Sequence, residues 1–297
     1  MSLKRDGVLF SIMVSFWALN YPLVKFALQY VDPFTLLFYR ILFSLVGILI
    51  IFNRKQLLKL KPEYIKPMFI LSMLSVFIFM ELWFIAESSI SSSLSSILIY
   101  TYPVISIVLS IVFLKESYNR YVVLGVIIGF SGIILIFYNA LFSSLGIGVV
   151  LALLGAICWA TGTVYYKKYL AAAPRETTNF FQFLFALIPS FAVAVYVTPT
   201  TSIFHPVPTF LLIAIIMGIP GTAVAYYAFL HLNREYRVST ISSFLFLVPA
   251  LSVVFGIVLL GEVPNIYEIS GLILVSIGII FSARGSSMAN LNYFRKN

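Results

Sequence analysis

The segment FWALNYPLVKFALQYVDPFTLLFYR, Phe16 to Arg40, decides the fold, because two apolar runs meet in it at the polar break Asp32-Pro33. Such runs recur along the 297 residues in blocks of about 20, and each block matches a bilayer hydrocarbon core of about 30 Å. Two cations, Lys25 and Arg40, lie inside this otherwise apolar segment. The segment therefore predicts two membrane-spanning helices joined by a short turn, and it raises the question of what the two cations contact.

Composition extends this prediction to the whole chain. The sequence is 61% hydrophobic and 10% charged, with a mean hydropathy of +1.05, which is outside the range of soluble globular domains. Long continuous apolar runs favour helices over a β-barrel, whose strands alternate over about ten residues. The first run is too long for a cleaved secretory signal and should stay in the membrane. We therefore predict an all-α polytopic membrane protein in contact with the lipid bilayer.

Proline, glycine and charged residues divide the chain into ten predicted spans. These lie near residues 7–28, 33–52, 64–87, 91–114, 118–138, 145–168, 177–197, 208–231, 237–260 and 266–284. Of the 19 Lys and Arg, all except Lys25 and Arg40 fall in loops on one side of this arrangement. The opposite loops contain Asp32, Glu87, Glu262 and Glu268. The positive-inside rule then places both termini in the cytoplasm, for a multi-pass protein of the cell membrane. This asymmetry accounts for the net charge of +9, so no nucleic-acid partner is expected.

An internal repeat relates the two halves of the sequence. Ser93, Pro103, Glu116, Gly125 and Gly132 stand 146 positions before Ser239, Pro249, Glu262, Gly271 and Gly278, and Trp17 and Lys25 stand 142 positions before Trp159 and Lys167. Each half contains five predicted spans, so the second half must enter the membrane from the opposite side. Inverted repeats are a hallmark of secondary transporters, whose site lies between the halves and opens alternately to each side. We predict residues 1–140 and 141–297 as two inverted five-helix repeats.

The same residues resemble a known family, the EamA-type members of the drug/metabolite transporter superfamily. The resemblance is carried by WALNYPLVK (Trp17–Lys25), Pro33, Arg40, Pro103 with Glu116, Pro249 with Glu262, and the glycines Gly125, Gly132, Gly271 and Gly278. It covers essentially the whole chain, although Ala18 and Leu19 replace the Gly-Ser often found there. The resemblance implies a ten-helix transporter that moves small metabolites, often outward, through a central cavity lined mainly by helices other than the fifth and tenth.

Three charged residues within the spans are candidate substrate contacts, because charge inside a membrane is costly and usually faces the bundle interior. Arg40 lies seven residues after Pro33, and Glu81 lies six residues before Glu87, so the two have similar depth. An Arg40–Glu81 pair would either fix two helices together or face the cavity. Lys25 either extends to the headgroups or binds a substrate carboxylate or phosphate. Glu81 is also a candidate for proton coupling, because low dielectric disfavours the ionised carboxyl group.

Aromatic residues provide a second set of candidates. Trp17 and Trp159 match across the repeat and fall near mid-membrane, away from the interfaces where Trp concentrates. They either pack in the core or form a wall for an apolar or aromatic substrate, to which Asn20 would donate a hydrogen bond. Tyr100, Tyr226 and Tyr227 are weaker candidates of the same kind.

Prolines within two predicted spans are candidates for movement. Pro103 and Pro249 interrupt helical hydrogen bonding, and they form either hinges for alternating access or fixed bends. Glu116 and Glu262 follow these spans and are expected to cap the next helices. Glycines on the fifth and tenth spans favour close packing within the protomer, so a monomer or weak homodimer is expected.

These features favour a secondary transporter, an exporter of small organic metabolites such as amino acids. A transporter of phosphorylated or carboxylated metabolites is the alternative. An intramembrane enzyme is less favoured, because His205 and His231 lie at loop edges and Glu81 is the only deeply placed carboxyl group. Metal-ligand spacing and a phosphate-binding glycine loop are absent from the sequence, so no metal or cofactor is expected, and an ATP-driven pump is disfavoured.

Overall fold

The computed structural model describes residues 2–58, 60–115, 120–141, 146–199, 203–204, 206–238, 241–242, 245 and 247–294. Within these ranges the secondary structure is helical, without a β-strand, as the sequence predicts. Glu116, Ser239 and His205, which the sequence analysis considers, lie outside the described residues.

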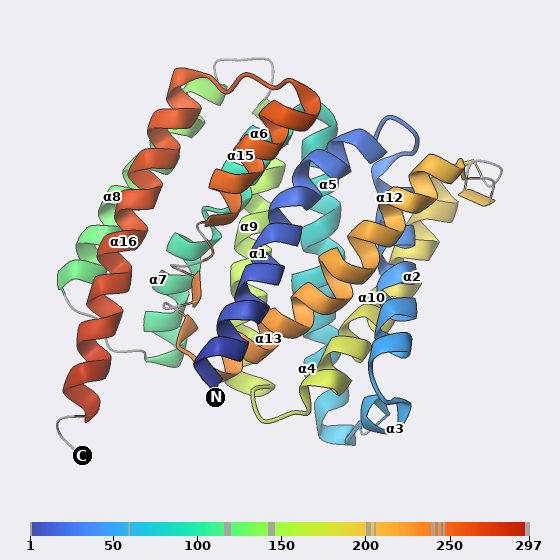
Figure 1. Cartoon of the computed structure of the whole chain (residues 1–297), viewed down its shortest axis with the longest axis horizontal. Helices are drawn as coiled ribbons and strands as arrows, with labels where there is room; N and C mark the ends of the chain where they lie inside the picture. Colours follow the sequence, from blue (N-terminus) through green and yellow to red (C-terminus); the bar gives the residue numbers. More distant parts are fainter. Residues whose placement is uncertain are drawn as a thin grey trace.

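The helices follow one another along the chain with short connections (Figure 1). In order they are α1 (Ser2–Ala27), α2 (Pro33–Ile51), α3 (Arg54–Leu57), α4 (Pro62–Ser72), η1 (Met73–Ile78), α5 (Phe79–Ser89), α6 (Ser92–Ile99), α7 (Tyr102–Leu114), α8 (Arg120–Leu141), α9 (Gly146–Tyr169), α10 (Arg175–Val197), α12 (Pro208–Gly218), η2 (Ile219–Val224), α13 (Ala225–Glu235), α15 (Leu247–Leu260) and α16 (Ile266–Phe294). The turn between α1 and α2 is closed by Asp32, whose Oδ1 accepts hydrogen bonds from the N–H groups of Phe34 and Thr35.

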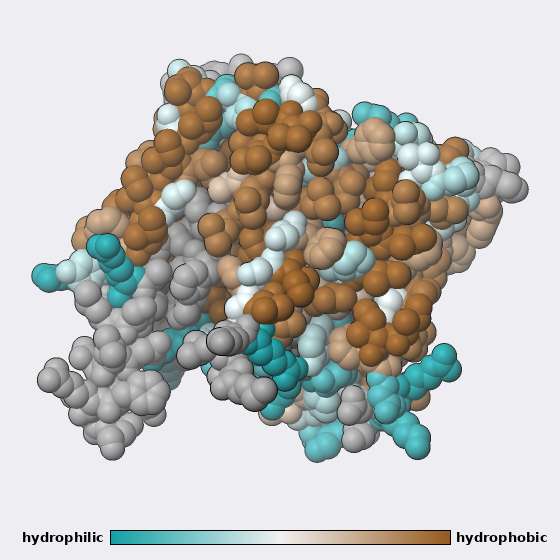
Figure 2. Space-filling model, viewed as in Figure 1, coloured by the Kyte–Doolittle hydropathy of each residue, from teal (hydrophilic) through white to brown (hydrophobic). Residues whose placement is uncertain are grey.

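Seven helices in the described part of the chain are long and apolar enough to cross a membrane. They are Arg5–Ala27, Pro33–Ile51, Pro62–Ser89, Ser92–Leu114, Gly146–Tyr169, Arg175–Val197 and Pro208–Glu235, and two shorter apolar helices cover Leu247–Leu260 and Ile266–Gly278. Apolar side chains also cover much of the face shown in Figure 2, and Ile50 and Val258 are 75% and 72% exposed. An outer surface of this kind is stable in lipid and not in water, which fits a multi-pass membrane protein.

Helices α8 and α16 lie side by side at one edge of the bundle (Figure 1). Glycine makes this packing close, because a Cβ at Gly278 of α16 would lie 2.5 Å from the carbonyl oxygen of Gly125 in α8. The small residues that the sequence analysis noted therefore pack against each other within one chain. Helices α8 and α16 therefore lie at the periphery, and the other helices form the centre of the molecule.

Two π-helical segments interrupt long helices, and the sequence analysis did not predict them. Segment η1 (Met73–Ile78) joins α4 to α5, and η2 (Ile219–Val224) joins α12 to α13. The two segments are 146 positions apart, which is the repeat offset. In η2, Pro220 lacks an N–H group, and the Thr222 hydroxyl donates to the carbonyl oxygen of Met217 at 2.7 Å. Segments of this type widen a helix locally and are common at functional sites.

The two prolines that were predicted to interrupt helices both lie at helix starts. Pro103 is in the first turn of α7, after a break at Tyr100 and Thr101 that separates α6 from α7. Pro249 is in the first turn of α15. A proline is tolerated at the start of a helix because the N–H groups there have no partner within the helix. Movement about these positions remains a prediction.

Candidate functional site

A cavity of about 20 Å³ lies at the centre of the helices, between residues of the amino-terminal and carboxy-terminal halves. It is lined by Trp17, Asn20 and Tyr21 of α1, Arg40 of α2, Phe79, Met80 and Trp83 of α5, Tyr100 after α6, Trp159 of α9 and Tyr226 of α13. We call this the central cavity. It has room for about one water molecule, which is less space than a metabolite needs.

Six of these lining residues are substrate contacts predicted from the sequence, namely Trp17, Asn20, Arg40, Tyr100, Trp159 and Tyr226. Tyr21 and the α5 group of Phe79, Met80 and Trp83 were not predicted. The α5 group could have been found, because spacings of three and four residues place these side chains on one face of a helix. Lys25, Glu81 and Tyr227 do not line the central cavity.

Aromatic rings form most of the cavity wall. The rings of Trp17 and Trp159, which match across the repeat, meet edge to face with their centroids 5.4 Å apart. Trp159 also stacks on Phe79 with a centroid distance of 5.1 Å and on Tyr102 at 4.0 Å. Each such pair contributes roughly 0.5–1.5 kcal/mol beyond its buried area. The wall therefore presents flat apolar surface to the cavity.

Arg40 is the one charged residue on the cavity wall. Its side chain is buried, and Nε donates a hydrogen bond to the Thr222 hydroxyl in η2 at 2.8 Å. Its Cζ lies 5.1 Å from the centroid of the Trp83 ring, a distance at which a cation is attracted to the aromatic face. Nη1 of Arg40 has no hydrogen-bond partner among the described residues.

The predicted pair of Arg40 with Glu81 is wrong. Among the described residues no ion pair joins the two, and neither carboxyl oxygen of Glu81 has a hydrogen-bond partner. The prediction rested on similar expected depth, but depth does not determine which face of a helix a side chain occupies. Arg40 lies over the ring of Trp83. Side chains two residues apart on a helix point roughly 200° apart, so Glu81 faces away from Trp83 and from Arg40.

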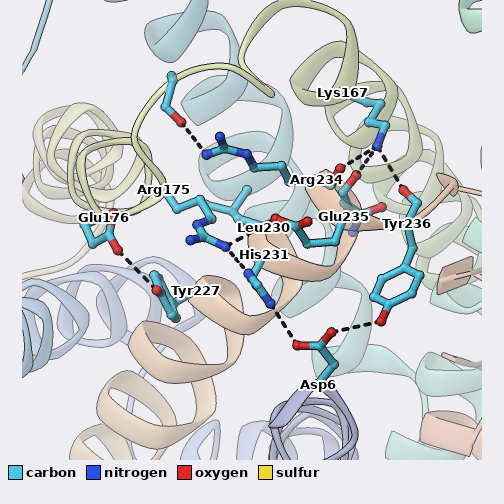
Figure 3. Close-up of polar contacts among 12 residues, drawn as sticks. Asp6, Lys167, Arg175, Glu176, Tyr227, Leu230, His231, Arg234, Glu235 and Tyr236 are labelled. Atoms are coloured by element: carbon cyan, nitrogen blue, oxygen red, sulfur yellow. Dashed lines mark hydrogen bonds and ion pairs between the residues drawn. The ribbon is translucent and has the colours of Figure 1, made fainter. Parts of the chain in front are cut away.

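Lys25 caps the end of a helix. Its Nζ donates to the carbonyl oxygens of Glu87 and Ile90, both at 2.8 Å, at the carboxy-terminal end of α5. The repeat-related Lys167 donates to the carbonyl oxygens of Asn233 and Tyr236, at 2.7 and 2.9 Å, at the carboxy-terminal end of α13 (Figure 3). A cation is favourable at this end of a helix, where carbonyl groups lack helical partners.

The acceptors of these two lysines are also repeat-related. Asn233 and Tyr236 stand 146 positions after Glu87 and Ile90. The two lysines therefore make equivalent contacts in the two halves. The sequence analysis also placed Glu87 in an outer loop, which is wrong. Glu87 is fully buried in α5, where it accepts hydrogen bonds from Trp83 Nε1 at 2.5 Å and from the Ser95 hydroxyl at 2.9 Å.

Tyr227, in the first turn of α13, does not line the central cavity and belongs to a polar cluster with residues of α1 and α10 (Figure 3). Its hydroxyl donates to Glu176 at 3.1 Å. In the same cluster, Asp6 lies 3.0 Å from His231 Nε2 and accepts a hydrogen bond from the Tyr236 hydroxyl at 2.8 Å. That hydrogen bond, together with burial, raises the pKa of Tyr236. The adjacent Tyr226 lines the cavity instead, because consecutive helical residues point about 100° apart.

Two cavity residues reach across to the π-helical segments of the opposite half. Asn20 Nδ2 donates to the carbonyl oxygen of Gly221 in η2 at 3.1 Å, and the Tyr226 hydroxyl donates to that of Ser75 in η1 at 3.0 Å. Ser75 and Gly221 are 146 positions apart. The cavity wall and the two π-helical segments therefore form one hydrogen-bonded unit.

Glu262 joins the two halves at one end of the molecule. The sequence predicts that it caps the following helix, but its carboxylate binds the amino-terminal end of α6 instead. Oε1 accepts from the Ser92 N–H at 2.6 Å, and Oε2 accepts from the Ser93 N–H at 2.9 Å. The hydroxyls of Ser92 and Ser93 also donate to Oε2, at 2.9 and 2.6 Å. We call this contact the Glu262 latch.

Comparison with known proteins identifies the family. The model of the EamA-like transporter family matches residues 6–138 and 146–284. The chain is 29% identical over 279 residues to the uncharacterized transporter YvbV of Bacillus subtilis, covering 91% of this chain and 89% of that protein. It is 26% identical over 284 residues to an uncharacterized transporter of Archaeoglobus fulgidus, with 93% and 96% covered.

A solved crystal structure has the same fold, with a TM-score of 0.71 at 17% sequence identity over 95% of this chain and 98% of the other. The family match covers both halves of the sequence and nearly all of the helices described above. The chain therefore belongs to the EamA-like transporter family and is a multi-pass membrane transporter.

Proposed function

We propose that this protein is a secondary transporter that exports small organic metabolites, such as amino acids, across the cell membrane by alternating access, with the central cavity as its substrate site. The observation that carries the proposal is the position of the cavity. Its wall combines side chains from both halves of the chain, and Trp17 and Trp159 meet there. A relative movement of the halves would open such a cavity on one side or the other.

The proposed architecture is ten spans in two inverted repeats, residues 1–140 and 141–297, with both termini in the cytoplasm. Two family matches, over residues 6–138 and 146–284, support this division. The equivalent contacts of Lys25 and Lys167 support it as well, as does the 146-residue offset between η1 and η2. The distribution of Lys and Arg supports the orientation.

Contacts between the halves at both ends of the molecule support alternating access. The chain begins at one end, where Asp6 contacts His231 and Tyr236, and the connection between α15 and α16 lies at the other end (Figure 1). That connection carries the Glu262 latch. With both ends joined and a cavity of about 20 Å³, we assign this structure to the occluded state of the cycle.

We also propose Glu81 as the site of proton coupling. Its side chain is 7% exposed, and both oxygens lack a hydrogen-bond partner in the described part of the chain. A buried carboxyl group without a counterion is more stable when protonated, so proton exchange there could accompany substrate movement. In proteoliposomes, Glu81→Gln should abolish the dependence of uptake on an imposed pH gradient while leaving substrate exchange active.

Solute counterflow tests the transport function. The purified chain would be screened by thermal shift against amino acids, other carboxylates, phosphorylated metabolites and amines, and hits would be radiolabelled. Proteoliposomes preloaded with unlabelled hit should accumulate the label transiently, and protein-free liposomes should not. If every compound that binds the purified protein fails to show counterflow, a transport function through this cavity is contradicted.

A further inference from the structure

Two buried hydrogen-bond donors on the wall of the central cavity have no partner. Nη1 of Arg40 and Nε1 of Trp159 are both unpaired among the described residues, and the two residues are 1% and 3% exposed. An unpaired buried donor is destabilising, and the cost is larger for a charged group. Both residues line the same cavity, so one ligand with acceptor atoms could satisfy the two donors together.

The positive charge of Arg40 also lacks a counterion on the cavity wall. None of the residues that line the cavity is acidic. The two buried carboxyl groups of α5 are not hydrogen-bonded to Arg40: Glu81 has no partner within reach, and Glu87 accepts from Trp83 and Ser95. A buried charge without a partner is costly, so the arrangement favours an anionic occupant.

We propose that the substrate of this cavity is a small organic monocarboxylate, whose carboxylate accepts hydrogen bonds from Arg40 and Trp159 and whose flat apolar body lies against the aromatic wall. This proposal rests on the proposed transport function and narrows its substrate class from small organic metabolites, amino acids included, to monocarboxylates without an ammonium group. Thr222 holds Nε of Arg40, so that the neighbouring Nη1 remains for the ligand. Guanidinium groups bind carboxylates well because they are planar and weakly hydrated.

The charge of the cavity distinguishes between classes of anion. One guanidinium group compensates one negative charge, and the wall contains no second cation, so a monoanion fits better than a phosphate dianion. An amine would meet the unpaired charge of Arg40 and be repelled. The wall offers no carboxylate to an α-ammonium group, which would face aromatic rings only. A simple carboxylate should therefore bind better than the matching amino acid.

A matched series of ligands tests this inference. The full chain in detergent would be titrated with 3-phenylpropionate, phenylalanine, phenethylamine and phenyl phosphate, which share a ring and differ in charged groups. We expect 3-phenylpropionate to raise the melting temperature most and phenethylamine to have no effect. Stronger binding of phenethylamine, phenylalanine or phenyl phosphate than of 3-phenylpropionate would overturn the proposal.

Three variants connect binding to the two donors. Trp159→Phe keeps an aromatic ring but removes the N–H donor together with part of the indole ring system, and Arg40→Gln removes the charge. Each should weaken 3-phenylpropionate binding about tenfold or more, the usual effect of losing a charge-assisted hydrogen bond. Lys168→Gln removes an exposed cation at the end of α9 and should leave binding unchanged. If Arg40→Gln does not fold, Trp159→Phe alone tests the proposal. An affinity of Trp159→Phe for 3-phenylpropionate equal to that of the unsubstituted protein would overturn the proposal.

Counterflow separates failure of this inference from failure of the transport function. If an amine or a phosphate shows counterflow and Trp159→Phe does not change its rate, the protein is a transporter but its substrate is not a monocarboxylate. Binding of 3-phenylpropionate that depends on Trp159, without counterflow, would retain the site and contradict transport.

Discussion

Nε of Arg40 in α2 donates a hydrogen bond to the Thr222 hydroxyl in η2 at 2.8 Å, so a π-helical segment of one half holds the buried cation of the other. The same hydroxyl donates to the carbonyl oxygen of Met217 at 2.7 Å. The Thr222 hydroxyl therefore pairs with Nε of Arg40 and with a carbonyl oxygen of its own widened helix. Nη1 of Arg40 has no hydrogen-bond partner among the described residues.

Thr222→Val should test this contact. Valine has nearly the same shape but neither donates nor accepts, so Nε of Arg40 would be left buried and unpaired. We expect the free energy of unfolding to fall by about 1–3 kcal/mol. Thermal unfolding in detergent measures the change. Thr222→Ser, which keeps the hydroxyl, should lose much less stability, and equal losses for the two variants would argue against the hydrogen bond.

Lys25→Met should destabilise the protein without changing substrate binding. The variant removes two charge-assisted hydrogen bonds to the carbonyl groups of Glu87 and Ile90, with an expected loss of about 2 kcal/mol. Lys167→Met should have a comparable effect, because Lys167 makes the equivalent contacts after α13. A Lys25→Met variant with an unchanged melting temperature and weaker substrate affinity would instead place Lys25 in the substrate site.

Gly221→Ala should disturb the contact between α1 and η2. An added Cβ would lie 2.6 Å from Asn20 Oδ1, so Asn20 would have to move away from the carbonyl oxygen of Gly221. We expect a loss of about 1–3 kcal/mol in unfolding free energy. Gly7→Ala is the matched control, because no atom lies within 4 Å of its added Cβ. If both variants have the same melting temperature, Asn20 does not depend on this close approach.

Tyr226→Phe and Tyr227→Phe form a matched pair of adjacent substitutions. Each removes one hydroxyl hydrogen bond, to Ser75 and to Glu176 respectively, and should cost about 0.5–1.5 kcal/mol of stability. Only Tyr226 lines the central cavity, so only Tyr226→Phe should change the apparent substrate affinity in counterflow. A change confined to Tyr227→Phe would contradict the position of the site.

The helical class and the family could be predicted from the sequence, because run length and spacing are local properties of the chain. The repeat offset also paired Trp17 with Trp159, and the structure brings the two rings together. Membership of the EamA-like transporter family, predicted from the motif residues, is confirmed by the match over both halves.

The partners of the charged residues could not be predicted, because they depend on where distant helix ends and faces meet. Lys25 lies 62 positions before the nearer of its two acceptors, and Glu262 lies 170 positions after Ser92. The predicted Arg40–Glu81 pair rested on expected depth along the helices, which says nothing about the faces that the two side chains occupy. The π-helical segments were missed because the apolar pattern of a long span does not indicate a local change from i+4 to i+5 hydrogen bonding.

Alternating access at the central cavity is tested most directly by measuring thiol labelling from each side of the membrane. In a Cys158→Ser background, Met80→Cys would place one thiol on the cavity wall, and Glu262→Gln would weaken the Glu262 latch. The labelling rates with membrane-impermeant reagents applied outside and inside would be compared with and without the latch substitution. We expect Glu262→Gln to raise the outside rate and lower the inside rate, because opening one side depopulates the other. Rates that rise on both sides, or do not change on either, would contradict alternating access through this cavity.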